Sequence, residues 1–241
     1  MKNDLRSFLK AVEEGTPELL VRVKKEVSPR WEVSAVQRKL ESEEKLPIVI
    51  FEKIAGHDMR LVTNLFSSKR HLALALGTTP KEVVAKFTEA QTHRIKPVVV
   101  KSGPVKEVVL TGDRADLRSL PIVTHGEKDG GPYISAGVTI MRDPASGALN
   151  AGIYRNRVLS PTRLTMNMAP LCHASQITEQ AEARKEHVEA AIVIGHHPAM
   201  GMASQQRGTL AECELETMGG LLGEPVELVR CETVDVLVPA D

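Results

Sequence analysis

Asn150, Arg155, His173 and Glu214 are the residues of this chain whose side chains could work together chemically. They supply a neutral oxygen ligand, a fixed cation, an imidazole and a carboxylate. Oxygen donors with one imidazole suit Mn²⁺ or Mg²⁺, and a guanidinium grips a carboxylate through two parallel hydrogen bonds. Together these groups can hold a divalent metal and a phosphorylated cofactor.

Each of these residues also has a structural interpretation. Residues 150–155 fit a strand that leads into a turn, with Arg155 in a surface ion pair. His173 fits a hydrogen-bonded structural histidine. Glu214 fits the solvated acidic face of a helix, because two further glutamates lie within two residues of it. The spacing of the three metal-type ligands does not by itself decide between the two interpretations.

The remaining histidine and cysteine patterns predict no metal centre. His196 and His197 are adjacent, and adjacent side chains on a strand point to opposite faces, so we expect a strand-end or loop pair. Cys172, Cys213 and Cys231 are odd in number and form no CxxC pair, which argues against a disulfide framework or a structural zinc site. We expect free, buried cysteines in a reducing compartment.

Composition narrows the class of protein further. The chain has 241 residues, 42% of them hydrophobic, so it can bury a sizeable core. Its 31 basic residues balance 31 acidic ones and only 3% are aromatic, which argues against binding of nucleic acid or an anionic membrane surface. No apolar stretch is typical of a signal peptide or a membrane span. We therefore predict a cytoplasmic protein.

Helical patterns and a short apolar run alternate in the first hundred residues. The first helix has its apolar residues on one face and ends near Gly15. Thr79, Pro80 and Glu82 form a capping box, which predicts a helix that starts there. The other predicted elements are helices around 33–40 and over 64–77, and a buried strand over 46–51.

The sequence beyond residue 96 is mostly of β type, and a domain boundary is expected near residues 100–112. Short β-branched runs alternate with Gly, Pro and Asp. The predicted strands are 97–100, 107–110, 134–141, 150–158, 188–195, 226–229 and 234–238, with one charged helix over 179–187.

Four longer segments carry a family resemblance. They are residues 116–122 (DLRSLPI), 131–135 (GPYIS), 150–155 (NAGIYR) and 223–235 (GEPVELVRCETVD). Together they closely resemble the UbiD family of prenylated-FMN-dependent reversible decarboxylases, and the likeness extends over nearly the whole chain. The fold it implies is α+β, with an N-terminal α/β domain (1–105) and a flavin-reductase-like split β-barrel domain (106–241) that is incomplete at its C-terminus.

The resemblance implies a cofactor site. In the family, prenylated FMN is held through Mn²⁺ (or Mg²⁺) with K⁺ nearby, and the metal ligands match Asn150, His173 and Glu214. The family arginine beside the flavin, which binds the substrate carboxylate, matches Arg155 and is the implied catalytic residue. At Cys172 the family more often has glutamine or lysine. The implied cofactor-binding residues are Asn150, Ile153, Tyr154, Arg155, Cys172, His173, Ser204 and Glu214.

The implied reaction is reversible decarboxylation of an aromatic, heteroaromatic or α,β-unsaturated carboxylic acid. The family's acidic proton donor lies beyond the matched sequence, so we expect a C-terminal remainder or a partner subunit to supply it. A flavin prenyltransferase would supply the cofactor, and the complete protein would be a homo-oligomer. The alternatives are a non-catalytic accessory subunit that binds the cofactor, or an ordinary FMN-binding split-barrel oxidoreductase.

Overall fold

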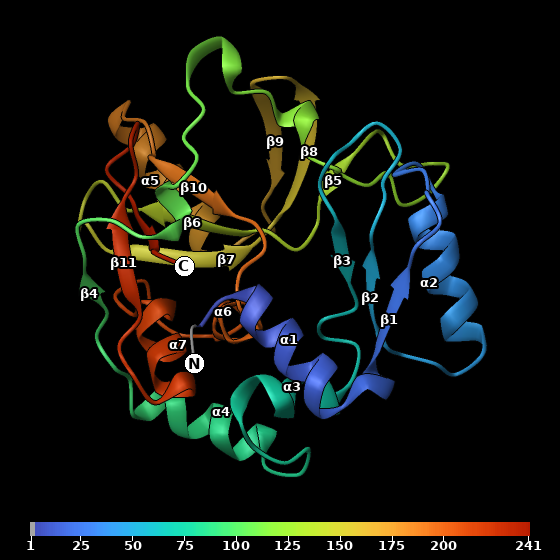
Figure 1. Cartoon of the computed structure of the whole chain (residues 1–241). Helices are drawn as coiled ribbons and strands as arrows, with labels where there is room; N and C mark the ends of the chain where they lie inside the picture. Colours follow the sequence, from blue (N-terminus) through green and yellow to red (C-terminus); the bar gives the residue numbers. More distant parts are fainter. Residues whose placement is uncertain (1–2) are drawn as a thin grey trace.

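The computed structural model describes residues 3–241, and its first part is built around a small mixed sheet with the strand order β1-β2-β3 (Figure 1). β2 pairs in parallel with β1 and antiparallel with β3. The elements are α1 (Leu5–Gly15), β1 (Leu20–Val23), α2 (Glu32–Ser42), β2 (Ile48–Phe51), β3 (Leu61–Thr63), α3 (Lys69–Leu76), α4 (Val83–Thr92) and β4 (Val98–Val99).

Local sequence explains where these elements begin and end. The Asp4 side chain caps α1 by accepting a hydrogen bond from the Ser7 amide at 2.7 Å. All four residues of β2 are buried, which confirms the predicted strand. The helix predicted over 64–77 is shorter, because Ser68 caps α3 and Gly77 ends it in the left-handed conformation with φ 59°.

The helix predicted to start at Thr79 begins later, at α4. The Glu82 carboxylate does accept a hydrogen bond from the Thr79 amide, at 3.3 Å, as a capping box requires. The residues between them form a turn, and Glu82 itself is the residue that precedes the helix.

The second part of the chain, together with β4, forms three open sheets with helices packed on them (Figure 1). Their strand orders are β10-β6-β7, β5-β8-β9 and β12-β11-β4. The elements are β5 (Tyr133–Ile134), β6 (Val138–Arg142), β7 (Leu149–Ile153), β8 (Arg155–Ser160), β9 (Arg163–Asn167), α5 (His173–Arg184), β10 (Ala190–Val193), α6 (Pro198–Ala203), α7 (Glu214–Leu222), β11 (Glu227–Arg230) and β12 (Leu237–Pro239).

Four sequence predictions in this part are corrected. Residues 107–110 form no strand, since no described strand lies alongside to pair with them. The predicted strand 134–141 is two strands, β5 and β6, separated by residues 135–137. The predicted strand 150–158 is likewise two strands, interrupted at Tyr154. The predicted helix 179–187 is α5, which starts at His173, because Cys172 caps it by accepting from the Ser175 amide at 3.4 Å. The helix ends at Arg184, because the next residue, Lys185, is left-handed with φ 58°.

The observed class is mixed α and β. Over residues 3–241 the strands form open sheets and no closed barrel, so the split-barrel prediction is not confirmed. The largest hydrophobic cluster joins α3 and α4 to β6, β7, α6 and α7, so residues from both sides of position 105 share one core. The division into domains 1–105 and 106–241 stays a prediction.

Two further findings bear on the composition argument. Within residues 3–241, no helix combines the length and the apolar character needed to cross a bilayer. The three cysteines are free thiols and are only partly buried, so the expectation of full burial is wrong.

Candidate functional site

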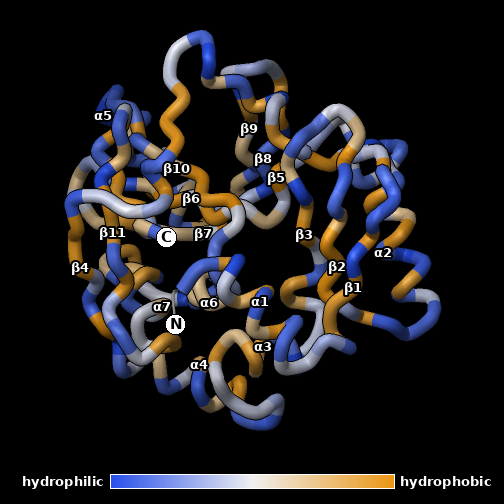
Figure 2. The backbone as a smooth tube through the Cα atoms, viewed as in Figure 1, coloured by the Kyte–Doolittle hydropathy of each residue, from blue (hydrophilic) through white to orange (hydrophobic). Residues whose placement is uncertain are grey.

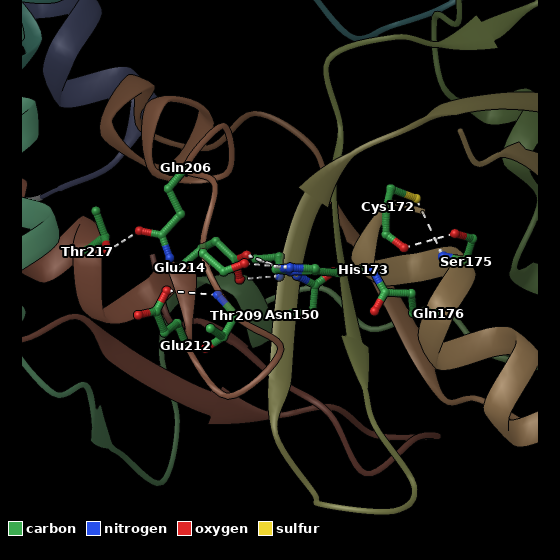
Figure 3. A network of polar contacts seen from close by, with 12 residues as sticks. Asn150, Cys172, His173, Ser175, Gln176, Gln206, Thr209, Glu212, Glu214 and Thr217 are labelled. Carbon is green, nitrogen blue, oxygen red and sulfur yellow. Dashed lines mark hydrogen bonds and ion pairs between the residues drawn. The ribbon is translucent and has the colours of Figure 1, made fainter. Parts of the chain in front are cut away.

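Three element ends bring Asn150, His173 and Glu214 together (Figure 3). Asn150 is the second residue of β7, His173 is the first residue of α5, and Glu214 is the first residue of α7. β7 is held in place by its antiparallel pairing with β6. Both helices pack against β7, so their first residues reach the same strand.

Short polar contacts connect the three side chains, which we call the ligand cluster. Asn150 Nδ2 donates to Glu214 Oε1 at 2.9 Å and lies 3.1 Å from His173 Nδ1. The Ala151 amide donates to the other carboxylate oxygen, Glu214 Oε2, at 2.8 Å. A half-turn of the Asn150 amide would present its oxygen in place of its nitrogen. The cluster can then offer one amide oxygen, one imidazole nitrogen and one carboxylate.

The charge of the ligand cluster is not balanced by the protein. The Glu214 side chain is only 4% exposed, and burial raises its pKa above the usual range. Among the described residues its only ion-pair partner is His173, 3.9 Å away. A buried carboxylate is costly unless a cation or several hydrogen bonds compensate it. The hydrogen bonds from Asn150 and the Ala151 amide compensate it only in part, since the pKa of Glu214 stays raised. A bound divalent cation would supply a full positive charge, and the set of one amide, one imidazole and one carboxylate fits Mn²⁺ or Mg²⁺.

Residues 208–212, which precede α7, lie against the ligand cluster. The sequence analysis did not identify them as part of the site. His173 Nε2 lies 3.0 Å from the Gly208 carbonyl oxygen and donates a hydrogen bond to it. This bond leaves Nδ1 unprotonated and free to act as a ligand. Glu212 forms an ion pair with Arg94 at 2.8 Å and accepts from the Thr209 amide at 3.0 Å. The Glu212 carboxylate, two residues before Glu214, is thus engaged away from the ligand cluster.

Tyr154 covers the open side of Asn150. It sits between β7 and β8, and its hydroxyl lies 3.4 Å from Asn150 Oδ1. Burial is the largest cause that raises its pKa to about 12, so the phenol is neutral at physiological pH. The ring folds back over Gly152, where a Cβ would lie 2.6 Å from the Tyr154 hydroxyl oxygen. Only glycine leaves space for this ring.

Substituting Gly152 by alanine is expected to displace the Tyr154 ring and lower the free energy of unfolding by about 1–3 kcal/mol. Chemical denaturation followed by circular dichroism measures this. Gly15→Ala is the matched control, because a Cβ there meets nothing within 4 Å and Gly15 ends a helix. The control is expected to be neutral or slightly stabilising. Equal stability of both variants would contradict the role given to Gly152.

Arg155 lies outside the ligand cluster, at the first residue of β8. Its guanidinium sits over the Tyr133 ring, 4.7 Å from the ring centroid, and 3.9 Å from an Asp129 carboxylate oxygen. The Arg155 side chain is 58% exposed, so it can meet a ligand. Asp129 is itself held by the Gly126 amide at 2.9 Å. Asp129 and Tyr133 were not predicted as site residues.

A pocket of about 460 Å³ begins beside Asp129. It runs between α2 and the loop before β5, and His125 lies in its wall. Burial lowers the pKa of His125, and the nearby Asp129 carboxylate opposes part of this shift. The pocket is lined by Ser34, Gln37, Arg38, Glu41, Asn64, His125, Gly126 and Asp129.

The remaining predicted site residues do not bond to the ligand cluster. Ser204 is buried at the end of α6, where its hydroxyl donates to the Gly201 carbonyl at 2.8 Å. Cys172 caps α5, and Ile153 ends β7 with its side chain partly exposed. His196 lies between β10 and α6 as expected, with its ring beside the Ala136 carbonyl.

Comparison with known families matches both parts of the chain. Residues 15–91 match the model of the 3-octaprenyl-4-hydroxybenzoate carboxy-lyase N-terminal domain. Residues 96–241 match that of the 3-octaprenyl-4-hydroxybenzoate carboxy-lyase Rift-related domain. The chain belongs to the UbiD family. The resemblance read from the sequence segments is therefore confirmed, and UbiD relatives are named as decarboxylases.

Two curated relatives of this UbiD chain are named as decarboxylases. It is 35% identical over 239 residues to anhydromevalonate phosphate decarboxylase of Methanothermobacter thermautotrophicus, covering 98% of this chain and 52% of the relative. It is 32% identical to phenolic acid decarboxylase of Sedimentibacter hydroxybenzoicus, with 98% and 52% covered. The chain thus spans about half the length of the curated relatives it matches.

Solved UbiD-class structures share the fold. The enzyme HmfF of Pelotomaculum thermopropionicum, in complex with FMN, matches with a TM-score of 0.91 at 36% identity, covering 98% of this chain and 52% of HmfF. The closed form of vanillic acid decarboxylase of Sedimentibacter hydroxybenzoicus matches with a TM-score of 0.92 at 31% identity, covering 100% and 53%. An evolved dimeric form of HmfF, in complex with prenylated FMN, also matches.

Proposed function

We propose that this chain forms the cofactor- and metal-binding half of a UbiD decarboxylase. Its substrate would be an aromatic, heteroaromatic or α,β-unsaturated carboxylic acid. The observation that carries the proposal is the ligand cluster, in which a buried carboxylate, an imidazole and an amide converge without a balancing cation. Membership of the UbiD family supports the reaction class, and the names of the relatives support an acid substrate.

Each residue then has a defined task. Asn150, His173 and Glu214 would hold Mn²⁺ or Mg²⁺, and this ion would help to retain prenylated FMN. Bound prenylated FMN supplies the electron sink for loss of CO₂. Arg155 binds and orients the substrate carboxylate through its guanidinium, and Tyr133 and Asp129 hold that guanidinium in place. Tyr154 stays protonated and shields Asn150 from water.

The other components of the proposal rest on the family. K⁺ would bind near the divalent metal, with Ser204, Cys172 and Ile153 beside the cofactor. A flavin prenyltransferase would supply prenylated FMN, and the complete protein would assemble from several copies around a completed split barrel. The acidic group that gives the proton after CO₂ leaves would come from the complementing half of the protein.

The mass of the bound cofactor tests the proposal. The chain is co-expressed with a flavin prenyltransferase, purified in Mn²⁺ and K⁺, and analysed by absorption spectroscopy and mass spectrometry of the released cofactor. Retention of prenylated FMN supports the proposal. Retention of unmodified FMN alone, with prenylated FMN present in the cells, would favour an ordinary flavin oxidoreductase instead.

A further inference from the structure

The loop between α6 and α7, residues 204–213, is held in place through one acidic side chain; we call it the α6–α7 loop. Among the described residues, the hydrogen bonds of residues 207–211 all lead to His173 or to Glu212. The Glu212 carboxylate divides its two oxygens between two partners. Oε2 accepts from the Thr209 amide at 3.0 Å (Figure 3), and Oε1 lies 2.8 Å from Arg94 Nη2. Glu212 therefore ties the loop to itself and to a distant part of the chain.

Gly208 gives the Glu212 side chain the space that it occupies. A Cβ at Gly208 would overlap Glu212 Oε2, and the other atoms that it would meet also belong to the Glu212 side chain. The carbonyl oxygen of the same glycine lies 3.0 Å from His173 Nε2. Gly208 thus contacts Glu212 on one side and a residue of the ligand cluster on the other.

Arg94, the partner of Glu212, has a fixed position of its own. It follows the end of α4, and its Nε donates to the Gln91 carbonyl at 2.9 Å. The Arg94 and Glu212 side chains are 25% and 30% exposed, so their ion pair is partly shielded from solvent and from salt. Arg94 can therefore serve as an anchor for the α6–α7 loop.

The end of α4 is fixed against α7, the helix that begins with Glu214. The two helices lie side by side at the lower left of Figure 2. Two adjacent glycines of α7 allow the close approach. A Cβ at Gly219 would lie 2.7 Å from the Ile95 carbonyl oxygen, and a Cβ at Gly220 would lie 2.7 Å from the His93 carbonyl oxygen. The backbone that carries Arg94 is thus placed directly against the helix that supplies a carboxylate to the ligand cluster.

We propose that Arg94 and Glu212 are positioning residues for the ligand cluster. Their ion pair holds the α6–α7 loop so that the Gly208 carbonyl meets His173, and it thereby sets the affinity of the cluster for a divalent cation. A hydrogen bond of this kind fixes the tautomer and the orientation of a metal-binding imidazole. Once the loop is released, the imidazole can turn, and binding of the ion must first order it again. The inference rests on the proposed metal site.

Isothermal titration with Mn²⁺ alone tests this role. Glu212→Ala is expected to weaken Mn²⁺ binding about tenfold, because the loop loses its anchor. Arg94→Gln should have the same effect, and Arg94→Lys should recover part of the loss because it keeps the charge. Glu232→Gln is the matched control. It breaks the 2.7 Å ion pair with Lys106, which also joins distant parts of the chain, and it should leave the Mn²⁺ affinity unchanged.

Gly208→Ala distinguishes positioning from a general loss of stability. Its Cβ displaces the Glu212 carboxylate, so the variant should lose about as much Mn²⁺ affinity as Glu212→Ala. In the double variant the second change should add nothing, because the side chain that the Cβ would meet is gone. In the metal-free chain, ¹⁵N NMR of the neutral His173 imidazole should show Nε2 protonated in wild type and a mixture of both tautomers in each single variant.

The possible outcomes separate this inference from the proposed function. If wild type binds Mn²⁺ and Glu212→Ala binds it equally well, the inference is wrong and the metal site stands. Additive losses in the double variant would also overturn it, since Gly208 and Glu212 would then act independently. A wild-type chain that binds no Mn²⁺ would refute the proposed metal site and this inference with it.

Discussion

Replacing Glu214 by glutamine is expected to weaken Mn²⁺-dependent retention of the flavin at least about 100-fold. Glutamine keeps the shape of the side chain but removes the only carboxylate of the ligand cluster. Isothermal titration with Mn²⁺, with and without FMN, measures the effect. Glu216→Gln is the matched control, because it lies in the first turn of the same helix and makes no contact with the cluster. Equal Mn²⁺ affinity of the two variants would refute the metal assignment.

In the metal-free chain, Glu214→Gln is expected to stabilise the fold. Burial raises the pKa of Glu214 in the folded state above the unfolded value, so the folded chain holds this proton more tightly. Its contribution to stability is complete below the unfolded pKa, near 4.5, and is lost as the pH rises through the folded pKa. Without metal, Glu214→Gln should therefore unfold at a higher temperature than wild type at neutral pH. With saturating Mn²⁺, only wild type should gain stability, by about 2.7 kcal/mol at a hundred times the Kd.

Replacing Arg155 by alanine is expected to lower kcat/KM of the completed enzyme about 10²–10³-fold. The guanidinium is the exposed cation that would bind the substrate carboxylate, and alanine leaves no donor there. Turnover is measured after reconstitution with the complementing half, on an acid that the wild-type enzyme decarboxylates. Arg155→Lys should recover part of the loss, because it keeps the charge without the two parallel hydrogen bonds.

Folding and cofactor binding should survive this change. The side chain is more than half exposed, and its contact with Tyr133 contributes about 0.5–1 kcal/mol. Arg163→Ala is the control, since Arg163 is exposed at the other end of the β8–β9 pair. If the control loses as much turnover as Arg155→Ala, the effect is structural and the assigned role is wrong. Full turnover of Arg155→Ala would have the same consequence.

Local sequence patterns were sufficient to predict a helix or strand where the residues of that element alone determine where it begins and ends. The apolar spacing before Gly15 predicted α1, and the all-apolar run 46–51 predicted β2, because burial dictates both. Asn150, His173 and Glu214 were predicted as a set through the family segments, and the structure brings Asn150 within hydrogen-bonding distance of both His173 and Glu214. Their spacing in the sequence carried no such information.

The errors arose where contacts distant in sequence decide the outcome. Residues 107–110 have strand propensity but no described partner, so the propensity is not realised. Asp129 was missed because only the fold places it beside Arg155, 26 positions later in the chain (155 − 129). The Gly208 carbonyl was missed because any residue type could supply it. Gly152 was the one residue whose type could have indicated this part of the site from the sequence, because the Tyr154 ring requires a glycine there.

If the ligand cluster binds metal and flavin as proposed, the long sequence separations within it have a consequence for how the chain would retain them. Asn150 is 23 residues from His173 and 64 from Glu214, so an unfolded chain must close large loops before the three groups can meet. Neither β7 nor either helix holds a partial site that could retain the ion by itself. Opening of any one of the three elements would release metal and flavin together. The flavin content of a purified sample should therefore report the fraction of molecules that are fully folded.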